Sequence, residues 1–220
     1  YSSAASDVYK RQVQIIASKE KKQTPYYTAR FASAAQIPAV HPFQRVFLPL
    51  HCAAGEFIKY NAGVEIPRGI FGLEDKIREK LVILKNAGVQ NALCGSLSAC
   101  GLAEGTGLRV FGDFGLNVFN SNTAACIPHP IVSFEQKLEA VNRIHAQDTG
   151  CLVYGRLPLM LTRNCPVQAN IGCAECKKQG KLTDRKGYTF PVVCSPYSCV
   201  ELLNLSLIHI SEPTRLLSIS

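Results

Sequence analysis

Short apolar segments alternate with amphipathic helical segments between Glu74 and Tyr154, and this alternation constrains the fold more than any other feature of the chain. Glu74 and Asp75 place negative charge in the first turn of an expected helix, which ends at Gly88. The other expected elements are strands over 89–93, 108–111 and 151–154, a short strand near 131–132, and helices over 96–104 and after a capping box at Ser133 and Gln136. Strands that alternate with helices favour a parallel sheet with crossover helices.

The number of expected strands is too small for a closed barrel. An eight-stranded βα barrel needs about 250 residues, whereas the alternating part of this 220-residue chain supplies roughly four strands. We therefore expect an α/β fold made of partial TIM-barrel-like parallel βα units, followed by a cysteine-rich module. An incomplete barrel exposes two strand edges, so we expect that a partner subunit can cover them.

The chain divides by its composition into five segments. Residues 1–12 and 205–220 resemble translated sequencing-adapter read-through, so we expect them to lie outside the fold and the natural chain to continue at both ends. Residues 13–72 contain many prolines and are expected to form an extended or irregular linker region, with a short strand over Val46–Leu48. Residues 73–160 hold the βα units, and residues 161–204 form the cysteine-rich module.

Composition narrows the class of protein. Hydrophobic residues make up 47% of the chain and charged residues 18%, which excludes wholesale disorder. No apolar run is long enough to span a bilayer and no secretory signal is visible, so we expect a cytoplasmic protein with no membrane partner. A net charge of +8 permits contact with RNA or another anionic partner but does not require it.

Five of the ten cysteines fall in one late stretch, with the spacing Cys165-x7-Cys173-x2-Cys176-x17-Cys194-x4-Cys199. One Cys-x2-Cys pair with single cysteines on both sides favours a four-iron four-sulfur cluster. Structural zinc is the alternative, although a zinc site usually has two paired knuckles. Unliganded thiols are the third interpretation. The other five cysteines (Cys52, Cys94, Cys100, Cys126 and Cys151) are expected to fill space in or beside the core.

Three polar residues near the ends of expected strands are candidate catalytic residues. Arg156 follows the last expected strand, where it can clamp an anionic substrate or pair with Asp113 or Glu201. Asp113 and Asn117 follow the strand over 108–111 and are weaker candidates at the same edge. No metalloprotease His-Glu-x-x-His, no Gly-x-Ser-x-Gly and no phosphate-binding Gly-x4-Gly-Lys sequence is present.

Several blocks of sequence together resemble the collagenase-like peptidase family, whose catalytic mechanism is unclassified. They are Pro67–Gly72, Gly112–Ser121, Tyr154–Met160, Asn164-Cys165-Pro166, Asp184–Gly187, Phe190-Pro191 and Cys199–Asn204. The resemblance covers roughly Thr28 to Asn204, with the motifs in register.

The resemblance implies a barrel-type α/β domain that leads into a cysteine-rich module. Cys165, Cys173, Cys176 and Cys199 match the family's thiols, and Cys194 is a spare that can replace Cys199. Some relatives are named as proteases, which implies a protein or peptide substrate. Others look like oxygen-independent iron–sulfur hydroxylases or modification factors for RNA or quinones. The first half of the barrel is missing here, so this chain alone is expected to be inactive, and a zinc-stapled, non-catalytic fragment is the remaining alternative.

Overall fold

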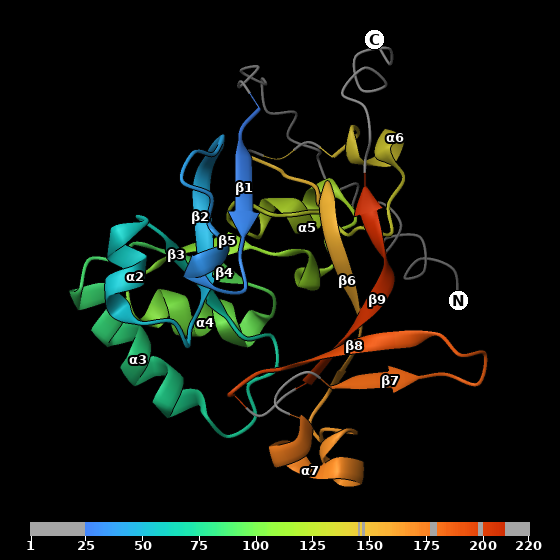
Figure 1. Cartoon of the computed structure of the whole chain (residues 1–220). Helices are drawn as coiled ribbons and strands as arrows, with labels where there is room; N and C mark the ends of the chain where they lie inside the picture. The colour runs from blue at the N-terminus through green and yellow to red at the C-terminus, as the bar shows by residue number, and fades with distance from the viewer. Residues whose placement is uncertain (1–24, 145, 147, 177–179, 198–199, 210–220) are drawn as a thin grey trace, which may run out of the picture.

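The computed structural model describes residues 25–144, 146, 148–176, 180–197 and 200–209 (Figure 1). Its first half is a parallel sheet, as the alternation predicts. The strands follow one another in the order β1-β2-β3-β4-β5, and every neighbouring pair is parallel. Their bounds are β1 Tyr27–Arg30, β2 Phe43–Pro49, β3 Gly63–Ile66, β4 Asn91–Cys94 and β5 Arg109–Gly112. The sheet curls into a half-barrel, which confirms the expected α/β fold of partial parallel βα units (Figure 1).

The expectation of an extended or irregular linker over residues 13–72 is wrong for residues 25–72, which the structure describes. Three of the five parallel strands lie there, and the strand expected over Val46–Leu48 is part of β2. The prolines that suggested an irregular segment lie at strand boundaries instead. Pro42 precedes β2, Pro49 ends it, and Pro67 follows β3. Proline is tolerated at strand ends, where no ladder hydrogen bond is lost.

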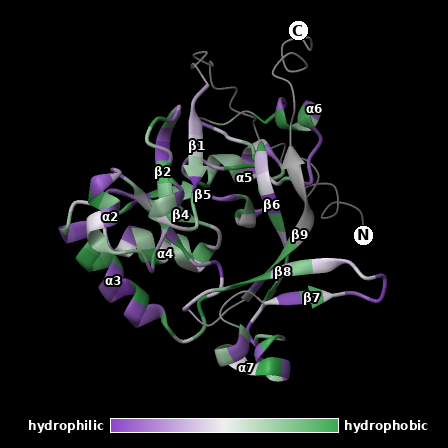
Figure 2. Ribbon diagram, viewed as in Figure 1, coloured by the Kyte–Doolittle hydropathy of each residue, from purple (hydrophilic) through white to green (hydrophobic). Residues whose placement is uncertain are grey.

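Three helices cover one face of the sheet: α2 (Ala54–Lys59), α3 (Glu74–Asn86) and α4 (Leu97–Gly105) (Figure 1). Helix α3 buries Ile77, Leu81 and Leu84 against the sheet, and Figure 2 shows hydrophilic residues on the same helix. This spacing confirms the expected amphipathic helix. The helix expected over 96–104 is α4, and its N-cap Ser96 accepts a hydrogen bond from the amide of Ala99 at 3.3 Å.

The opposite, concave face of the sheet carries its own apolar floor. Phe47, Leu93 and Phe111 form a buried cluster, and the rings of Phe47 and Phe111 lie 5.7 Å apart. Their neighbours Leu48, Cys94 and Val110 belong to the cluster under the helices, as the period of two in a strand requires. The short strands therefore bury apolar side chains on both faces, which is typical of parallel barrel strands.

The segment after β5 differs from the expected pattern. It contains the 3-10 helix η2 (Phe114–Leu116) and the short helices α5 (Ser121–Ala125) and α6 (Leu138–Val141). Residues near 131–132 make only isolated bridges, Val118 to Val132 and Ile131 to Gly150. The capping box is also wrong, because Ser133 accepts from the amide of Glu135 and Gln136 donates to the carbonyl of Phe119. Lys137 occupies the N-cap of α6 instead.

A second, antiparallel sheet follows, with the strand order β6-β9-β8-β7. Its elements are β6 Tyr154–Thr162, helix α7 Gln168–Cys176, β7 Lys181–Thr183, β8 Thr189–Cys194 and β9 Val200–His209. The strand expected over 151–154 is thus displaced into β6, which pairs with β9 and not with the half-barrel. The expected tail boundary is also wrong, because β9 runs on to His209 with Leu207 opposite Arg156.

The described residues contain no helix with the length and apolar character that a membrane crossing demands.

Candidate functional site

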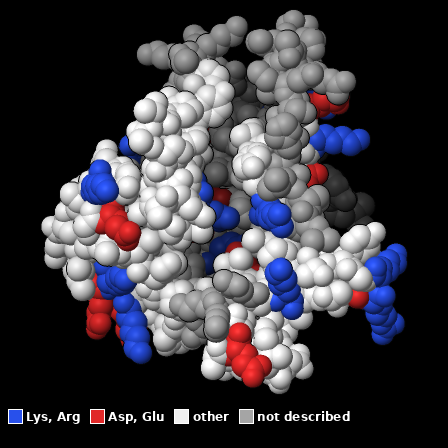
Figure 3. Space-filling view, in the orientation of Figure 1, with Lys and Arg blue, Asp and Glu red and all other residues white. Residues whose placement is uncertain are grey.

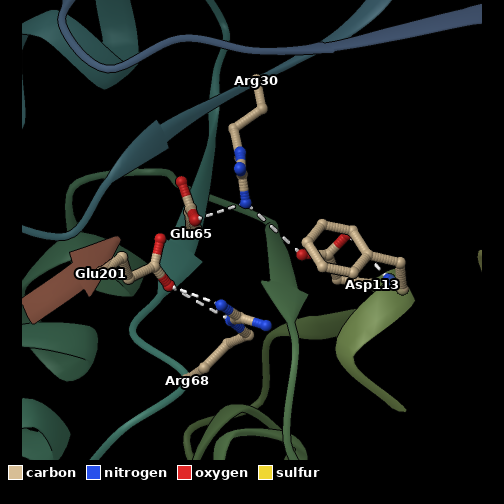
Figure 4. Close-up of polar contacts among 6 residues, drawn as sticks. Arg30, Glu65, Arg68, Asp113 and Glu201 are labelled. Atoms are coloured by element: carbon tan, nitrogen blue, oxygen red, sulfur yellow. Dashed lines mark hydrogen bonds and ion pairs between the residues drawn. The ribbon is translucent and has the colours of Figure 1, made fainter. Parts of the chain in front are cut away.

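A cluster of ion pairs lies at the carboxyl ends of the parallel strands, where active sites of α/β barrels are found. Arg30 is the last residue of β1, Glu65 lies near the end of β3, and Asp113 comes directly after β5. The Nη1 atom of Arg30 is 3.0 Å from Oε1 of Glu65 and 3.5 Å from Oδ2 of Asp113 (Figure 4). One guanidinium therefore bridges two carboxylates from non-adjacent strands.

The second sheet contributes to the same cluster. Glu201 of β9 accepts hydrogen bonds from both Nε (3.2 Å) and Nη2 (2.8 Å) of Arg68, which follows β3 (Figure 4). Both side chains are partly buried. This bond connects residues far apart in the sequence, and it places β9 next to the carboxyl edge of the half-barrel. Figure 3 shows basic and acidic side chains in a hollow between these two parts of the molecule.

The ring of Phe114 is within cation–π range of both arginines. The guanidinium carbon of Arg30 is 5.9 Å from the ring centroid and that of Arg68 is 5.3 Å away. The amide of Phe114 donates to Oδ1 of Asp113 at 2.8 Å, so the residue that carries the ring also orients the carboxylate. Cation–π contacts of this kind hold guanidinium groups without neutralising them.

Burial shifts the proton affinity of the carboxyl groups in the cluster. Burial raises the pKa of Asp113 above its ordinary value of 3.8, and the opposing attraction of Arg30 does not cancel this. The pKa of Glu65 is raised for the same reason. Burial acts to lower the pKa of Arg30, but the carboxylates of Glu65 and Asp113 outweigh it and raise that pKa. Carboxyl groups with raised pKa values next to a fixed cation are suited to holding or moving a proton.

The three candidate catalytic residues do not come together. Asp113 is 5% exposed and belongs to the ionic cluster. Asn117 is exposed just after η2, with a left-handed φ of 53°. Arg156 is exposed on β6, and the carboxylates expected as its partners pair with other arginines: Asp113 with Arg30 and Glu201 with Arg68.

Sequence reasoning missed Arg30, Glu65 and Arg68 because they lie in the segment expected to be a linker. A signal was available at one of them. Arg68 follows the apolar strand residue Ile66 and Pro67, and charged residues directly after a buried strand mark the functional edge of a parallel sheet.

A second polar cluster lies near the start of β5. The Nδ1 atom of His129 lies 2.6 Å from Oδ2 of Asp148. The Nε2 atom of the same ring accepts a hydrogen bond from Nε of Arg109 at 3.1 Å. The imidazole stacks on Phe111, with ring centroids 4.4 Å apart. Both ring nitrogens are thus engaged, so the histidine acts here as a brace between β5 and the loop that carries Asp148.

The cysteine-rich module brings four thiols near one another. Burial raises the pKa of Cys194, and so do the nearby Cys165, Cys176 and Cys173. Cys165 precedes α7, Cys173 and Cys176 lie on it, and Cys194 ends β8. Cys194 was expected only as a spare, whereas Cys199 lies outside the described residues.

Local packing holds this thiol cluster in place. Cys165, Cys176 and Cys194 pack against a small core of Val167, Val192 and Leu202. A Cβ on Gly180 would lie 2.8 Å from Val167 and 3.1 Å from Sγ of Cys176, so only glycine fits there. Gly172 interrupts α7 with a left-handed φ of 74°. The interruption separates the first helical turn of α7 from the segment that carries Cys173 and Cys176.

The donor chemistry of this cluster suits a soft metal or an iron–sulfur cluster, which thiolates bind preferentially. Among the described residues, however, no three side chains of the types His, Cys, Asp and Glu are spaced to hold a metal ion as they stand. Several basic residues of the module, including Arg163, Lys181 and Arg185, are exposed. Lys177 and Lys178 lie outside the described residues.

Comparisons of the chain with protein-family models, with curated proteins and with solved structures found no match.

Proposed function

We propose that this chain is part of a collagenase-like peptidase family protein that carries an iron–sulfur cluster and modifies an anionic substrate such as RNA. The observation that carries the proposal is the packing of Cys165, Cys176 and Cys194 around one small core, with Cys173 close enough to raise the pKa of Cys194. Unliganded cysteines usually fill apolar cores, whereas Cys173 is exposed beside the other three thiols.

The ligands in this proposal are Cys165, Cys173 and Cys176, with Cys199 or Cys194 as the fourth. The fit rests on the chemistry of the donors, on the packing of Cys165, Cys176 and Cys194 against one small core, and on the glycine beside Cys176. Such a cluster, when bound, supplies electron transfer that no protein side chain can provide. Zinc on the same thiols is the competing outcome, and it would make the module a structural staple.

The roles of the chain's own residues follow from the ionic cluster. Arg30 and Arg68 provide positive charge at the carboxyl edge, where they can exchange a carboxylate partner for an anionic group of a substrate. Asp113, with its raised pKa, holds or releases a proton beside them. Phe47, Leu93 and Phe111 close the floor of the concave face and exclude water beneath the site.

Peptide hydrolysis is the second candidate function, and one observation favours it. Glu65 and Asp113 flank one guanidinium, and both have raised pKa values. Two carboxyl groups in such an arrangement can divide the roles of acid and base in hydrolysis. This activity would need no cluster.

Location and partners belong to the same proposal. Nine cysteines of the described part are free thiols, which suits the reducing cytoplasm. Among the described residues, β1 pairs only with β2 and β5 only with β4, so these two strands are the edges of the half-barrel. A partner subunit or further chain that pairs with these edges would complete the barrel.

The experiment compares RNA from cells that lack the full-length protein with RNA from cells complemented by wild type, Cys165→Ser or Cys126→Ser. Nucleoside mass spectrometry should show one modified nucleoside that disappears without the protein and with Cys165→Ser, but returns with Cys126→Ser. Cys126 is the matched control because it is exposed and outside the module. Unchanged RNA, together with peptide cleavage by purified Cys165→Ser that Asp113→Asn abolishes, would favour the peptidase instead.

A further inference from the structure

A cavity of about 330 Å³ lies against helix α6, in the segment that follows β5. Most of the residues that line it are apolar, and all of these except one are half-buried, so part of each side chain remains free to meet a ligand. The apolar lining residues are Val132, which is buried, and Phe134, Leu138, Val141 and Leu152. This size and this lining are typical of a small-molecule site.

The cavity lies at the end of two short segments that extend the parallel sheet beyond β5. The amide of Ile131 donates to the carbonyl of Gly112, the last residue of β5, at 2.9 Å, and Ile131 forms a parallel bridge to Gly150. Residues 132–134 and 151–152, which line the cavity, come directly after these contacts. The cavity is therefore at the carboxyl end of the parallel segments, where ligands of α/β sheets bind.

Gln136 gives the cavity a polar group that lacks a partner. Its Nε2 atom donates a hydrogen bond to the carbonyl of Phe119, and this bond fixes the orientation of the amide. The Oε1 atom at the other side of the amide is buried, and no described residue donates a hydrogen bond to it. A buried acceptor without a donor is unfavourable, because it has lost its bonds to water. Since Gln136 lines the cavity, a molecule in the cavity can supply the missing donor.

We propose that this cavity binds a small, mostly apolar molecule that carries one hydrogen-bond donor, an N–H or O–H group, for Oε1 of Gln136. None of the residues that line the cavity is charged, so an ion would lose its hydration there without gaining an ion pair. A neutral ligand fits the lining better. This inference is independent of the proposed function, because it involves neither the thiol cluster nor an exchange of partners in the ionic cluster.

The cavity adjoins the ionic cluster. The ring of Phe134, which lines the cavity, packs edge-on against the ring of Phe114, with 5.6 Å between the centroids. The ring of Phe114 in turn contacts the guanidinium groups of Arg30 and Arg68. One pair of aromatic rings therefore connects the wall of the cavity to the two arginines.

Cys151 provides a site-specific readout for the test. It lines the cavity and is exposed, so a ligand in the cavity should shield its thiol from a reagent in solution. Trypsin releases it in the peptide of residues 144–156, which contains no other cysteine. Cys126 is the internal reference, because it is exposed, does not line the cavity, and is the only cysteine in the tryptic peptide of residues 110–137.

The probes are indole, which has an apolar body and one N–H donor, and 1-methylindole, which lacks the donor. The full chain is alkylated with iodoacetamide at a series of probe concentrations, and both peptides are followed by mass spectrometry. At saturation, indole should slow alkylation of Cys151 relative to Cys126 by about fivefold or more. The concentration of 1-methylindole that gives half of the maximal effect should be about fivefold or more higher, because the hydrogen bond to Gln136 is missing.

Two variants complete the test. Gln136→Met removes the acceptor, so the two probes should then differ by less than about twofold. Gln90→Met makes the same change at an exposed glutamine outside the cavity and should keep the preference for indole. Alkylation of Cys151 that indole leaves unchanged, or equal effects of the two probes on wild type, would overturn the proposal. The wild-type comparison decides the matter even if Gln136→Met does not fold.

Discussion

Asp113 shows how one side chain connects sequence, packing and chemistry. It directly follows the buried strand β5, caps η2 through the amide of Phe114, and pairs with Arg30, while only 5% of the residue is exposed. An ionised carboxylate in such a place is costly unless it is paired and hydrogen-bonded. Asp113 meets both conditions, yet burial still raises its pKa.

The raised pKa of Asp113 predicts a pH-dependent contribution to stability. The folded protein binds the proton more tightly than the unfolded chain, so this contribution is fully present below about pH 4 and is lost as pH rises through the folded pKa. The free energy of unfolding of wild type minus that of Asp113→Asn should therefore fall between pH 4 and neutral pH. Urea unfolding at a series of pH values measures it, and a difference that increases with pH would contradict the assignment.

Arg68 and Glu201 test the contact between the two sheets. Because this bond is partly buried and uses two donors, Arg68→Ala should lower the free energy of unfolding by about 1 to 3 kcal/mol. Arg68→Lys should recover only part of this free energy, since the lysine ammonium lacks the two planar N–H donors of a guanidinium. Arg78→Ala is the control, because its ion pair with Asp75 is exposed and is expected to contribute about 0.5 kcal/mol or less. Equal effects of Arg68→Ala and Arg78→Ala in denaturant unfolding would refute the role of the contact.

At the scale of elements, two glycines make opposite predictions. A Cβ on Gly115 in η2 would lie 2.5 Å from the carbonyl oxygen of Gly95, which is backbone and cannot move aside. Gly115→Ala should therefore destabilise the protein by roughly 1 to 3 kcal/mol. Gly101 lies inside α4 with open space around it, so Gly101→Ala should stabilise by roughly 0.5 to 1 kcal/mol. Thermal unfolding of both variants checks the pair, and the same sign of shift in both would be inconsistent with this packing.

Elements inside the recognisable strand–helix alternation were predictable from the sequence, and those among the prolines before it were not. Helix α3 has an acidic first turn, apolar positions on one face and a glycine after its end, so its bounds follow directly from the sequence. Strands β1 and β3 were missed because they lie in the proline-rich segment, whereas β4 and β5, which also have four residues each, stand beside the recognisable helices α3 and α4. Ser133 and Gln136 have the spacing of a capping box, but tertiary contacts recruit both side chains elsewhere.

Strand β6 shows why pairing partners are harder to predict than strands. Its sequence contains Pro158, and the register with β9 shifts on both sides of that residue. Proline is tolerated here because β6 is an edge strand of its sheet. Nothing in the local sequence distinguishes an antiparallel partner some forty residues later from a parallel partner in the half-barrel, so Arg156 was assigned to the wrong edge.

At the scale of the whole molecule, the described residues form an α/β half-barrel followed by a four-stranded antiparallel sheet. The carboxyl edge of the half-barrel and strand β9 meet at the ionic cluster, so the site depends on both parts. The sequence pattern was sufficient for the βα units and for the grouping of the cysteines. It was not sufficient for the ionic cluster, because Arg30, Glu65 and Glu201 become neighbours only when the strands curl and the second sheet folds back.

The central claim is that the clustered thiols bind an iron–sulfur cluster, and metal analysis of the full-length protein purified without oxygen tests it most directly. We predict about four iron and four sulfide per chain, loss of both in Cys165→Ser and Cys176→Ser, and retention of both in Cys126→Ser. Stoichiometric zinc without sulfide, or iron that remains after both replacements in the module, would contradict the account.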